Sequence, residues 1–284
     1  MSEGVRRIGV HTSIAGGIYL SIERARRLGC NTVQIFSHSP RSWALRKITK
    51  EEIQDFRRLR SLYDISPVYI HTSYLINLAS SNKVVAEKSV ELLSKEMEIA
   101  DELGADYLVL HPGSASDSEK AGLERIIKNL KRSLKRNYRS KLLLENTAGE
   151  RGDLTSRIHQ LARIIKSLNN KSIGGICIDT CHAFQGGYDI SCDEGVTALI
   201  DEIKGEIGLD RLKLLHLNDS KKAFGSGVDR HEHIGKGSIG EKGFETLLNN
   251  PFLSNVPVIL ETPKENDEDD LRNLKVVRRL ARLF

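Results

Sequence analysis

The stretch GGICIDTCHAF, residues 174–184, is the clearest example of the pattern that decides the fold. It is a short, continuously apolar run, which is typical of a strand buried on both faces of a parallel sheet. Asp179 and His182 stand where the apolar run ends. Seven other β-rich runs occur along the chain: RIGVHT (7–12), TVQIFS (32–37), PVYIHT (67–72), DYLVLHP (106–112), KLLLEN (141–146), LKLLHLND (212–219) and PVILET (257–262).

Charge-rich segments of helical period separate these runs. The clearest spans residues 84–104 and ends on a glycine suited to a helix C-terminus. Strands that alternate with helices pair in parallel, and eight of them predict an α/β fold of the closed (β/α)8 TIM barrel type. A doubly wound open sheet is the structural alternative. Because no Pro/Gly/Ser linker divides the chain, we expect one barrel domain over residues 1–284.

The composition sets limits on function. The chain has 284 residues, 39% of them hydrophobic, and a net charge of +5, which is compatible with a polyanionic partner without requiring one. No stretch approaches the roughly 20 apolar residues of a membrane helix, and the N-terminus lacks the regions of a signal peptide. We therefore expect a cytoplasmic protein with no membrane partner. The four cysteines form no CxxC pair, which favours reduced thiols over disulfides or a Cys-zinc site.

Metal-ligand residue types end six successive predicted strands. A single histidine or glutamate at a strand end is usually a hydrogen-bonded rim residue. Six that converge on one barrel mouth favour a cation instead, because carboxylates and imidazoles packed together would otherwise be poorly solvated. The six residues are His71, His111, Glu145, Asp179, His216 and Glu261.

Two loops add three further donors. His182 follows Asp179, and the segment after the seventh predicted strand places Asp229 two positions before His231. Alternate residues of an extended loop point the same way, which suits binding of one ion, although a solvated charged loop is the other interpretation. Nine imidazole and carboxylate donors without thiolates favour zinc or manganese and exceed what one ion can hold.

Three segments resemble the signature motifs of the endonuclease IV family of apurinic/apyrimidinic (AP) endonucleases. They are HTSYLINLA (71–79), GICIDTCH (175–182) and LHLNDSKKAFGSGVDRH (215–231), and the resemblance spans essentially the whole chain. It implies a (β/α)8 barrel with three zinc ions. His71, His111 and Glu145 would hold the first ion, and His182, Asp229 and His231 the third. The second would be held by Glu145, Asp179, His216 and Glu261, with Glu145 as the bridge.

The resemblance also implies an activity. It is hydrolysis of the phosphodiester 5′ to an abasic site in double-stranded DNA, leaving a 3′-hydroxyl and a 5′-deoxyribose phosphate, with cleaning of blocked 3′ ends as a related reaction of base excision repair. Glu145 would be the catalytic residue. Manganese could substitute for zinc at one site, and we expect a monomer.

Recognition of DNA is implied for other residues. Those matching Arg41, Tyr74 and Leu75 enter the duplex in the family and fill the space around an extruded nucleotide. For Leu75, packing beneath its loop is the alternative. His11 is expected beside the metal site or the phosphate, or as an ordinary rim histidine. His38, His159 and His233 are predicted to be surface or loop residues.

Two other functions fit parts of the pattern. A metal-dependent sugar isomerase or epimerase also uses such residues at strand ends, but it needs neither the pair Asp229 and His231 nor the wedge of Tyr74 and Leu75. A DNA-binding barrel without catalysis would not need every ligand position to be occupied.

Overall fold

Eight parallel strands form the centre of the molecule. The computed structural model describes residues 6–283. Strand order is β1-β10-β7-β6-β5-β4-β3-β2, and a parallel bridge between His11 and Gln34 joins the two ends of this series. The strands are β1 Ile8–Val10, β2 Val33–Phe36, β3 Val68–His71, β4 Tyr107–Leu110, β5 Lys141–Glu145, β6 Ile173–Asp179, β7 Leu212–His216 and β10 Val258–Leu260.

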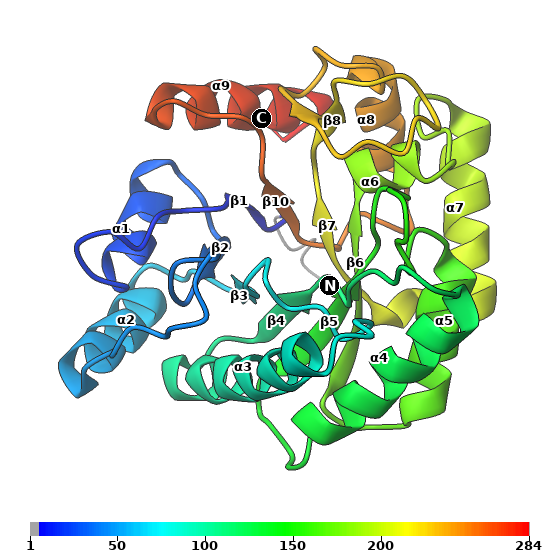
Figure 1. Cartoon of the computed structure of the whole chain (residues 1–284). Helices are drawn as coiled ribbons and strands as arrows, with labels where there is room; N and C mark the ends of the chain where they lie inside the picture. The colour runs from blue at the N-terminus through cyan, green and yellow to red at the C-terminus, as the bar shows by residue number, and fades with distance from the viewer. Residues whose placement is uncertain (1–5, 284) are drawn as a thin grey trace.

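Helices surround the strands as an outer ring (Figure 1). They include α1 Leu20–Arg27, α2 Lys50–Leu62, α3 Lys83–Leu103, α4 Glu119–Ser133, α5 Ile158–Leu168, α7 Asp193–Glu206, α8 Gly240–Asn249 and α9 Asp267–Leu280. Within residues 6–283, no helix is both long and apolar enough to cross a membrane.

The long helix α3 shows how local sequence sets these boundaries. The Asn82 side chain accepts hydrogen bonds from the backbone N–H groups of Val84 and Val85, which caps the first turn. The helix ends at Gly104, whose φ of 71° is left-handed and costs glycine little. The predicted helix over residues 84–104 is therefore confirmed within one residue at each end.

The (β/α)8 TIM barrel is confirmed, and the doubly wound open sheet is wrong. The structure adds elements that the sequence did not suggest. The predicted strand over residues 212–219 ends at His216, and β8 Asp219–Ser220 then pairs antiparallel with β9 His231–Glu232. A short helix, α6 Thr180–Gln185, follows β6 directly, and a 3-10 turn over Leu209–Arg211 precedes β7. The single-domain prediction over 1–284 extends to residues 1–5 and 284, which lie outside the described residues.

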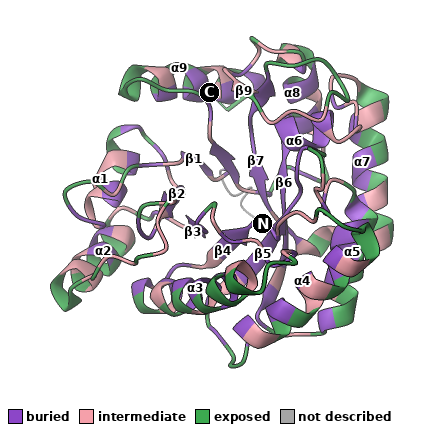
Figure 2. Cartoon of the chain, in the orientation of Figure 1, coloured by how far each residue is buried: buried purple, intermediate pink, exposed green. Residues whose placement is uncertain are grey.

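The barrel interior is filled by side chains. Figure 2 shows the strands as the buried centre and the outer faces of the helices as exposed. The interior is therefore a packed core, and a site can form only at a mouth of the barrel. The inner layer consists of Tyr69, Val109, Leu143, Cys177, Leu214 and Ile259. Within the described chain all four cysteines are free thiols, three of them buried.

Candidate metal centre at the carboxyl end of the barrel

The carboxyl ends of the strands bring the predicted donors to one mouth. Parallel pairing aligns neighbouring strand ends, so that Asp179 of β6 lies opposite His216 of β7. His111 directly follows β4, and Glu261 directly follows β10. All nine donors fall into three groups whose ligand atoms lie within 4.8 Å of one another. Their role as ligands stays a prediction, but their convergence is a property of the fold.

The first group contains His71, His111 and Glu145. The Glu145 Oε2 atom lies 3.2 Å from His71 Nε2 and 3.3 Å from His111 Nε2. Glu145 is fully buried and His71 is 3% exposed, whereas the His111 side chain is 30% exposed and forms the solvent side of the group.

The second group uses the other oxygen of Glu145. The Oε1 atom lies 2.8 Å from His216 Nδ1, which is in turn 3.2 Å from Glu261 Oε2 and 4.0 Å from Asp179 Oδ2. One carboxylate thus divides its two oxygens between two groups. This arrangement suits a ligand that bridges two ions.

The third group joins β6 to the loop after β7. Asp179 caps α6 by accepting a hydrogen bond from the His182 backbone N–H, which places the His182 ring one turn into the helix. His182 Nε2 lies 3.3 Å from Asp229 Oδ2, and His231 Nε2 lies 3.1 Å from Asp229 Oδ1. His231 is held by the β8–β9 hairpin, so tertiary pairing completes this group.

The ring nitrogens of four histidines are oriented as metal ligands are. In each, one ring N–H donates to an oxygen of the surrounding protein, and the other ring nitrogen points toward the donor group. The acceptors are Thr72 O for His71, Asn146 O for His182, Gln34 Oε1 for His216 and Glu261 O for His231. The Nε2 atom of His231 is buried and makes no hydrogen bond to the described residues, although Asp229 Oδ1 lies 3.1 Å away. The donor set and this unpaired nitrogen fit a borderline cation such as zinc.

The carboxylates of the three groups favour the protonated form of the histidines, and the histidines favour the ionised form of the carboxylates. Burial lowers the pKa of His182, but the carboxylates of Asp179, Asp229 and Glu145 together raise it, to about 10. Burial also lowers the pKa of His231, while Asp179 and Asp229 together raise it, to about 9. Burial raises the pKa of Glu145, but His111, His216 and His71 together lower it well below its ordinary value, so this carboxylate is ionised at neutral pH. A cation would therefore find ionised carboxylates and compete with protons for the imidazoles.

Two buried thiols lie beside these groups. The Cys177 sulfur is within 4.8 Å of donors from Glu145 and His216, and the Cys181 sulfur is close to Asp179 and His231. Burial raises the pKa of both thiols, which keeps them protonated and makes them poor ligands.

Sequence reasoning missed the amides that hold the donors in place. Gln34 on β2 accepts from His216 Nε2 and donates to Glu261 Oε1. Asn218 donates to Asp179 Oδ2 and accepts from the Glu261 backbone N–H. The signal for Gln34 was present, since an amide inside the apolar run TVQIFS needs a buried partner.

The predicted DNA contacts lie at the same mouth. Tyr74 is 59% exposed, Arg41 is exposed and Leu75 is half-buried. The Ser73 hydroxyl and the Tyr74 backbone N–H both donate to Pro40 O, which joins the loops after β2 and β3. A cavity of about 220 Å³ opens beside Tyr74 and is lined by His71, Thr72, Ser73, Ile76, His111, Thr147, Ala148, Glu150, Asp153, His182 and Asp229.

The remaining histidines differ in their surroundings. His11 Nδ1 lies 3.3 Å from Glu261 Oε1, beside the second group. His159 is exposed and His233 is half-buried. The expectation for His38 is corrected in one respect: it lies in a loop, but it is 3% exposed and packs 3.5 Å from the buried carboxylate of Glu96. Packing of this loop on α3 buries the histidine.

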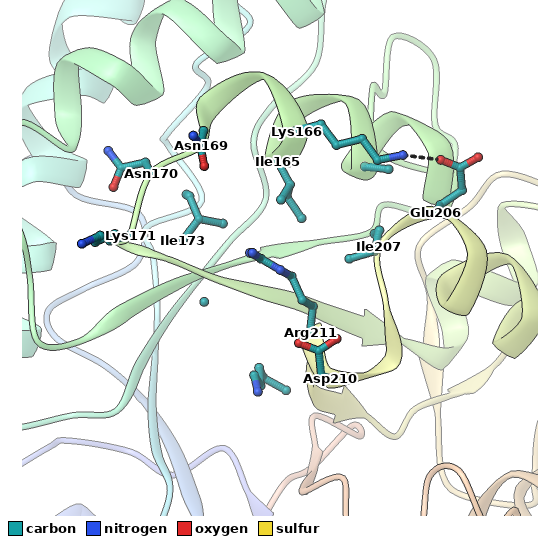
Figure 3. A pocket seen from close by; sticks show the side chains of 13 residues that line it. Ile165, Lys166, Asn169, Asn170, Lys171, Ile173, Glu206, Ile207, Asp210 and Arg211 are labelled. Atoms are coloured by element: carbon teal, nitrogen blue, oxygen red, sulfur yellow. Dashed lines mark hydrogen bonds and ion pairs between the residues drawn. The ribbon is translucent and has the colours of Figure 1, made fainter.

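A larger hollow lies at the opposite end of the barrel (Figure 3). Its volume is about 680 Å³, and it is formed near the end of α5 and the starts of β6 and β7. Its charged side chains are partly exposed, and Lys166 pairs with Glu206 at 3.0 Å. It lacks a buried group of titratable side chains, so size alone does not make it the candidate site.

Comparison with known proteins agrees with this geometry. The family described as "Xylose isomerase-like TIM barrel" matches residues 22–281. A "Probable endonuclease 4" from Methanoculleus marisnigri is 43% identical over 96% of this chain and 98% of its own length. The crystal structure of endonuclease IV from Thermus thermophilus superimposes with a TM-score of 0.87 at 38% identity, covering 97% of this chain and 99% of that one. A D-tagatose 3-epimerase-like protein reaches a TM-score of 0.75, over 98% of this chain and 97% of that one, but at 22% identity it shows the fold alone. The chain therefore belongs to the endonuclease IV family of AP endonucleases.

Proposed function

We propose that this enzyme hydrolyses the phosphodiester 5′ to abasic sites in double-stranded DNA, leaving a 3′-hydroxyl and a 5′-deoxyribose phosphate. Removal of groups that block 3′ ends is the related activity. The observation that carries the proposal is Glu145, a fully buried carboxylate whose two oxygens face two different groups of imidazole donors. Such a bridge suits a multinuclear centre for phosphodiester hydrolysis.

Three zinc ions are the proposed cofactors, with manganese able to replace one of them. His71, His111 and Glu145 would hold the first ion, and His182, Asp229 and His231 the third. The second ion would be held by Glu145, Asp179, His216 and Glu261. When bound, these ions would supply Lewis-acid activation of water and of the scissile phosphate.

The chain's own residues would fix the geometry of the reaction. Glu145 would act as the catalytic bridge, because its buried carboxylate fixes the distance between the first and second donor groups. Gln34 would hold Glu261 and the His216 ring in place through its two hydrogen bonds. Asn218 would do the same for Asp179. Preorganised supports of this kind restrict the donors to one geometry.

Recognition of the abasic site is assigned to the loops after β2 and β3. Arg41, Tyr74 and Leu75 would enter the duplex beside the cavity of about 220 Å³ at the metal groups. An exposed tyrosine at the rim of such a cavity can stack against an unstacked base. The exposed wedge and the third donor group favour this reaction over sugar isomerisation or epimerisation. The enzyme is proposed to work in the cytoplasm as a monomer.

The test is cleavage of a duplex that carries one tetrahydrofuran abasic analogue, with the products resolved by end group. We expect a single incision 5′ to the analogue, a 3′-hydroxyl on the upstream fragment, and loss of activity after treatment with a strong chelator. The undamaged duplex is the control substrate. Failure to incise the analogue while a ketohexose is epimerised would replace this function with the sugar reaction.

A further inference from the structure

Gln185 forms hydrogen bonds to the loop after β8 through both the nitrogen and the oxygen of its side-chain amide. It is the last residue of α6 and is 2% exposed. Its amide nitrogen lies 2.6 Å from Ser220 Oγ and 3.1 Å from the carbonyl oxygens of both Lys222 and Ala223. Its amide oxygen accepts from the Ser226 hydroxyl and, at 3.5 Å, from a backbone N–H. One side chain thus contacts both arms of the loop.

The tip of the loop also contacts Phe184, since the Phe224 ring lies 5.3 Å from the Phe184 ring and the Gly225 backbone N–H donates to Phe184 O. Residues 221–226 are all exposed, and Gly225 and Gly227 adopt φ values of 68° and 64°. The base of the loop is fixed separately, because Asp219 accepts hydrogen bonds from the backbone of residues 237, 239 and 240. An exposed segment with two glycines has many alternative conformations, so its order depends on tertiary contacts.

The same loop delivers two of the proposed metal ligands. Asp229 and His231 follow its tip, and both face His182, which lies three residues before Gln185 on the same short helix. Residues three apart lie on neighbouring parts of one helix face. One turn of α6 therefore carries a donor of the third group and the contact that orders the loop bearing the other two donors.

We propose that Gln185 is a positioning residue that orders the loop over residues 220–228 and thereby sets the third donor group. This inference rests on the proposed function, because it assigns that group to a metal ion. Gln185 lies outside the three donor groups, so its effect would pass through the loop.

Replacing Gln185 removes the bonds without removing a donor. In Gln185→Leu, the freed carbonyl groups of the loop can turn to solvent, since the loop is already exposed. The cost should therefore fall on loop order more than on global stability. We expect the metal content to fall from about three to about two ions per chain, because the first two groups do not use this loop. Cleavage of the loop by trypsin should become at least ten times faster, because Lys221, Lys222 and Arg230 would be free to enter the protease.

Gln160→Leu is the matched control. Gln160 is also a buried glutamine; it lies on α5, where it accepts from the Arg157 backbone N–H and donates to Glu119. Its replacement tests the general effect of losing a buried amide. Both variants would be analysed as purified full-length protein for melting temperature, metal content after dialysis, and trypsin cleavage sites by mass spectrometry.

Loss of one ion and faster cleavage within residues 221–230, seen in Gln185→Leu and not in Gln160→Leu, supports the proposal. If trypsin cleaves Gln185→Leu within residues 221–230 at the wild-type rate, the proposal is overturned. If Gln185→Leu does not fold, Ser226→Ala removes one of the same hydrogen bonds from the exposed side and should show a smaller change in the same direction; no change in cleavage there also overturns it. A wild-type protein with fewer than three ions contradicts the proposed metal centre, and the trypsin comparison then decides the role of Gln185 separately.

Discussion

The Glu145 side chain illustrates how one residue links two groups of donors. Both of its oxygens are engaged, at 2.8 Å from His216 and 3.2 Å from His71. Its pKa is held well below the usual range by its imidazole neighbours despite the opposing effect of burial. The position therefore provides a fixed negative charge as well as two ligand atoms.

Glu145→Gln tests the charge and the bridge together. Glutamine has nearly the same volume but lacks the charge and one of the two ligand oxygens. We expect turnover of abasic duplex to fall by about 100-fold or more, equivalent to about 3 kcal/mol in the activation barrier, with little change in DNA affinity. Single-turnover kinetics and binding titrations measure the two quantities. Turnover within about tenfold of wild type would rule out Glu145 as the catalytic bridge.

Another buried carboxylate lies beneath the loop after β3. Glu96 is fully buried on α3, where its Oε1 atom accepts from the Ser73 backbone N–H at 3.1 Å. Burial raises the pKa of Glu96 to about 8, outweighing the opposite effects of Ser73 and His71. The folded protein therefore holds a proton here that the unfolded chain releases at about pH 4.5.

The sign of the pH dependence follows directly. Stability from this group is greatest below about pH 4.5, decreases as the pH rises, and stops changing above about pH 8. Glu96→Gln stays neutral and keeps an oxygen for Ser73. Relative to wild type, it should gain about 4 kcal/mol of unfolding free energy between about pH 5 and about pH 8.5, since one pKa unit corresponds to about 1.4 kcal/mol.

Urea unfolding at the two pH values, with saturating zinc, measures this gain. Glu98→Gln, which removes an exposed carboxylate from the same helix, is the control. A difference between Glu96→Gln and wild type that stays constant with pH would mean that Glu96 does not change its charge on unfolding in this range.

At the scale of elements, two loops form one unit at the barrel mouth. The Ser73 hydroxyl and the Tyr74 backbone bind Pro40, so the Tyr74 loop and the Arg41 loop share hydrogen bonds. The Tyr74 ring packs edge-on against Phe36, with centroids 5.4 Å apart, while the residue remains 59% exposed. The aromatic ring is thus supported on one side and open to a ligand on the other.

Replacing Tyr74 and Leu75 together by alanine tests the wedge. The double variant should bind abasic duplex about 10- to 100-fold more weakly at fixed salt, because base stacking contributes about 1–3 kcal/mol. Metal content should stay at the wild-type value, and the melting temperature should change little. Leu62→Ala, an exposed leucine at the end of α2, is the control. If the ratio of the affinities for abasic and intact duplex stays at the wild-type value, the wedge assignment is refuted. A large drop in melting temperature would instead assign Leu75 to the core.

At the scale of the whole molecule, the three donor groups lie at the carboxyl ends of the barrel strands. Glu145, Asp179 and His216 are fully buried and come from three adjacent strands. Charges buried this deeply are expensive unless they are paired or bound to a cation. The proposed ions would therefore contribute to the stability of the barrel as well as to catalysis.

Removal of the metals should destabilise the entire fold. We expect about three ions per chain, chiefly zinc, and a melting temperature lower by about 10 °C after exhaustive chelation, because binding to the folded state stabilises it. Elemental analysis and calorimetry measure both. Zinc should restore the transition, and magnesium should not, since magnesium prefers oxygen ligands in octahedral geometry. One ion or fewer per chain in a fully active enzyme would contradict the trinuclear centre.

The sequence by itself determined the alternation of parallel strands with helices and the positions of the strand-end donors, whereas closure of the sheet into a barrel was decided by the structure. Eight apolar runs of similar length required parallel strands covered by helices, and a residue such as His71 or Glu145 at the end of a run had to lie at the common mouth. Asp229 and His231 could be assigned only through their motif, because their position relative to β7 depends on a hairpin that local periodicity does not reveal.

Only the tertiary structure decided which groups support these donors. Gln34 lies 227 residues from Glu261, and Gln185 contacts a loop about 40 residues further along the chain. His38 and Glu96 likewise meet only after the loop after β2 packs on α3. Apolar periodicity reports which face of an element is buried, whereas the partner of a buried polar group depends on which distant element packs against that face.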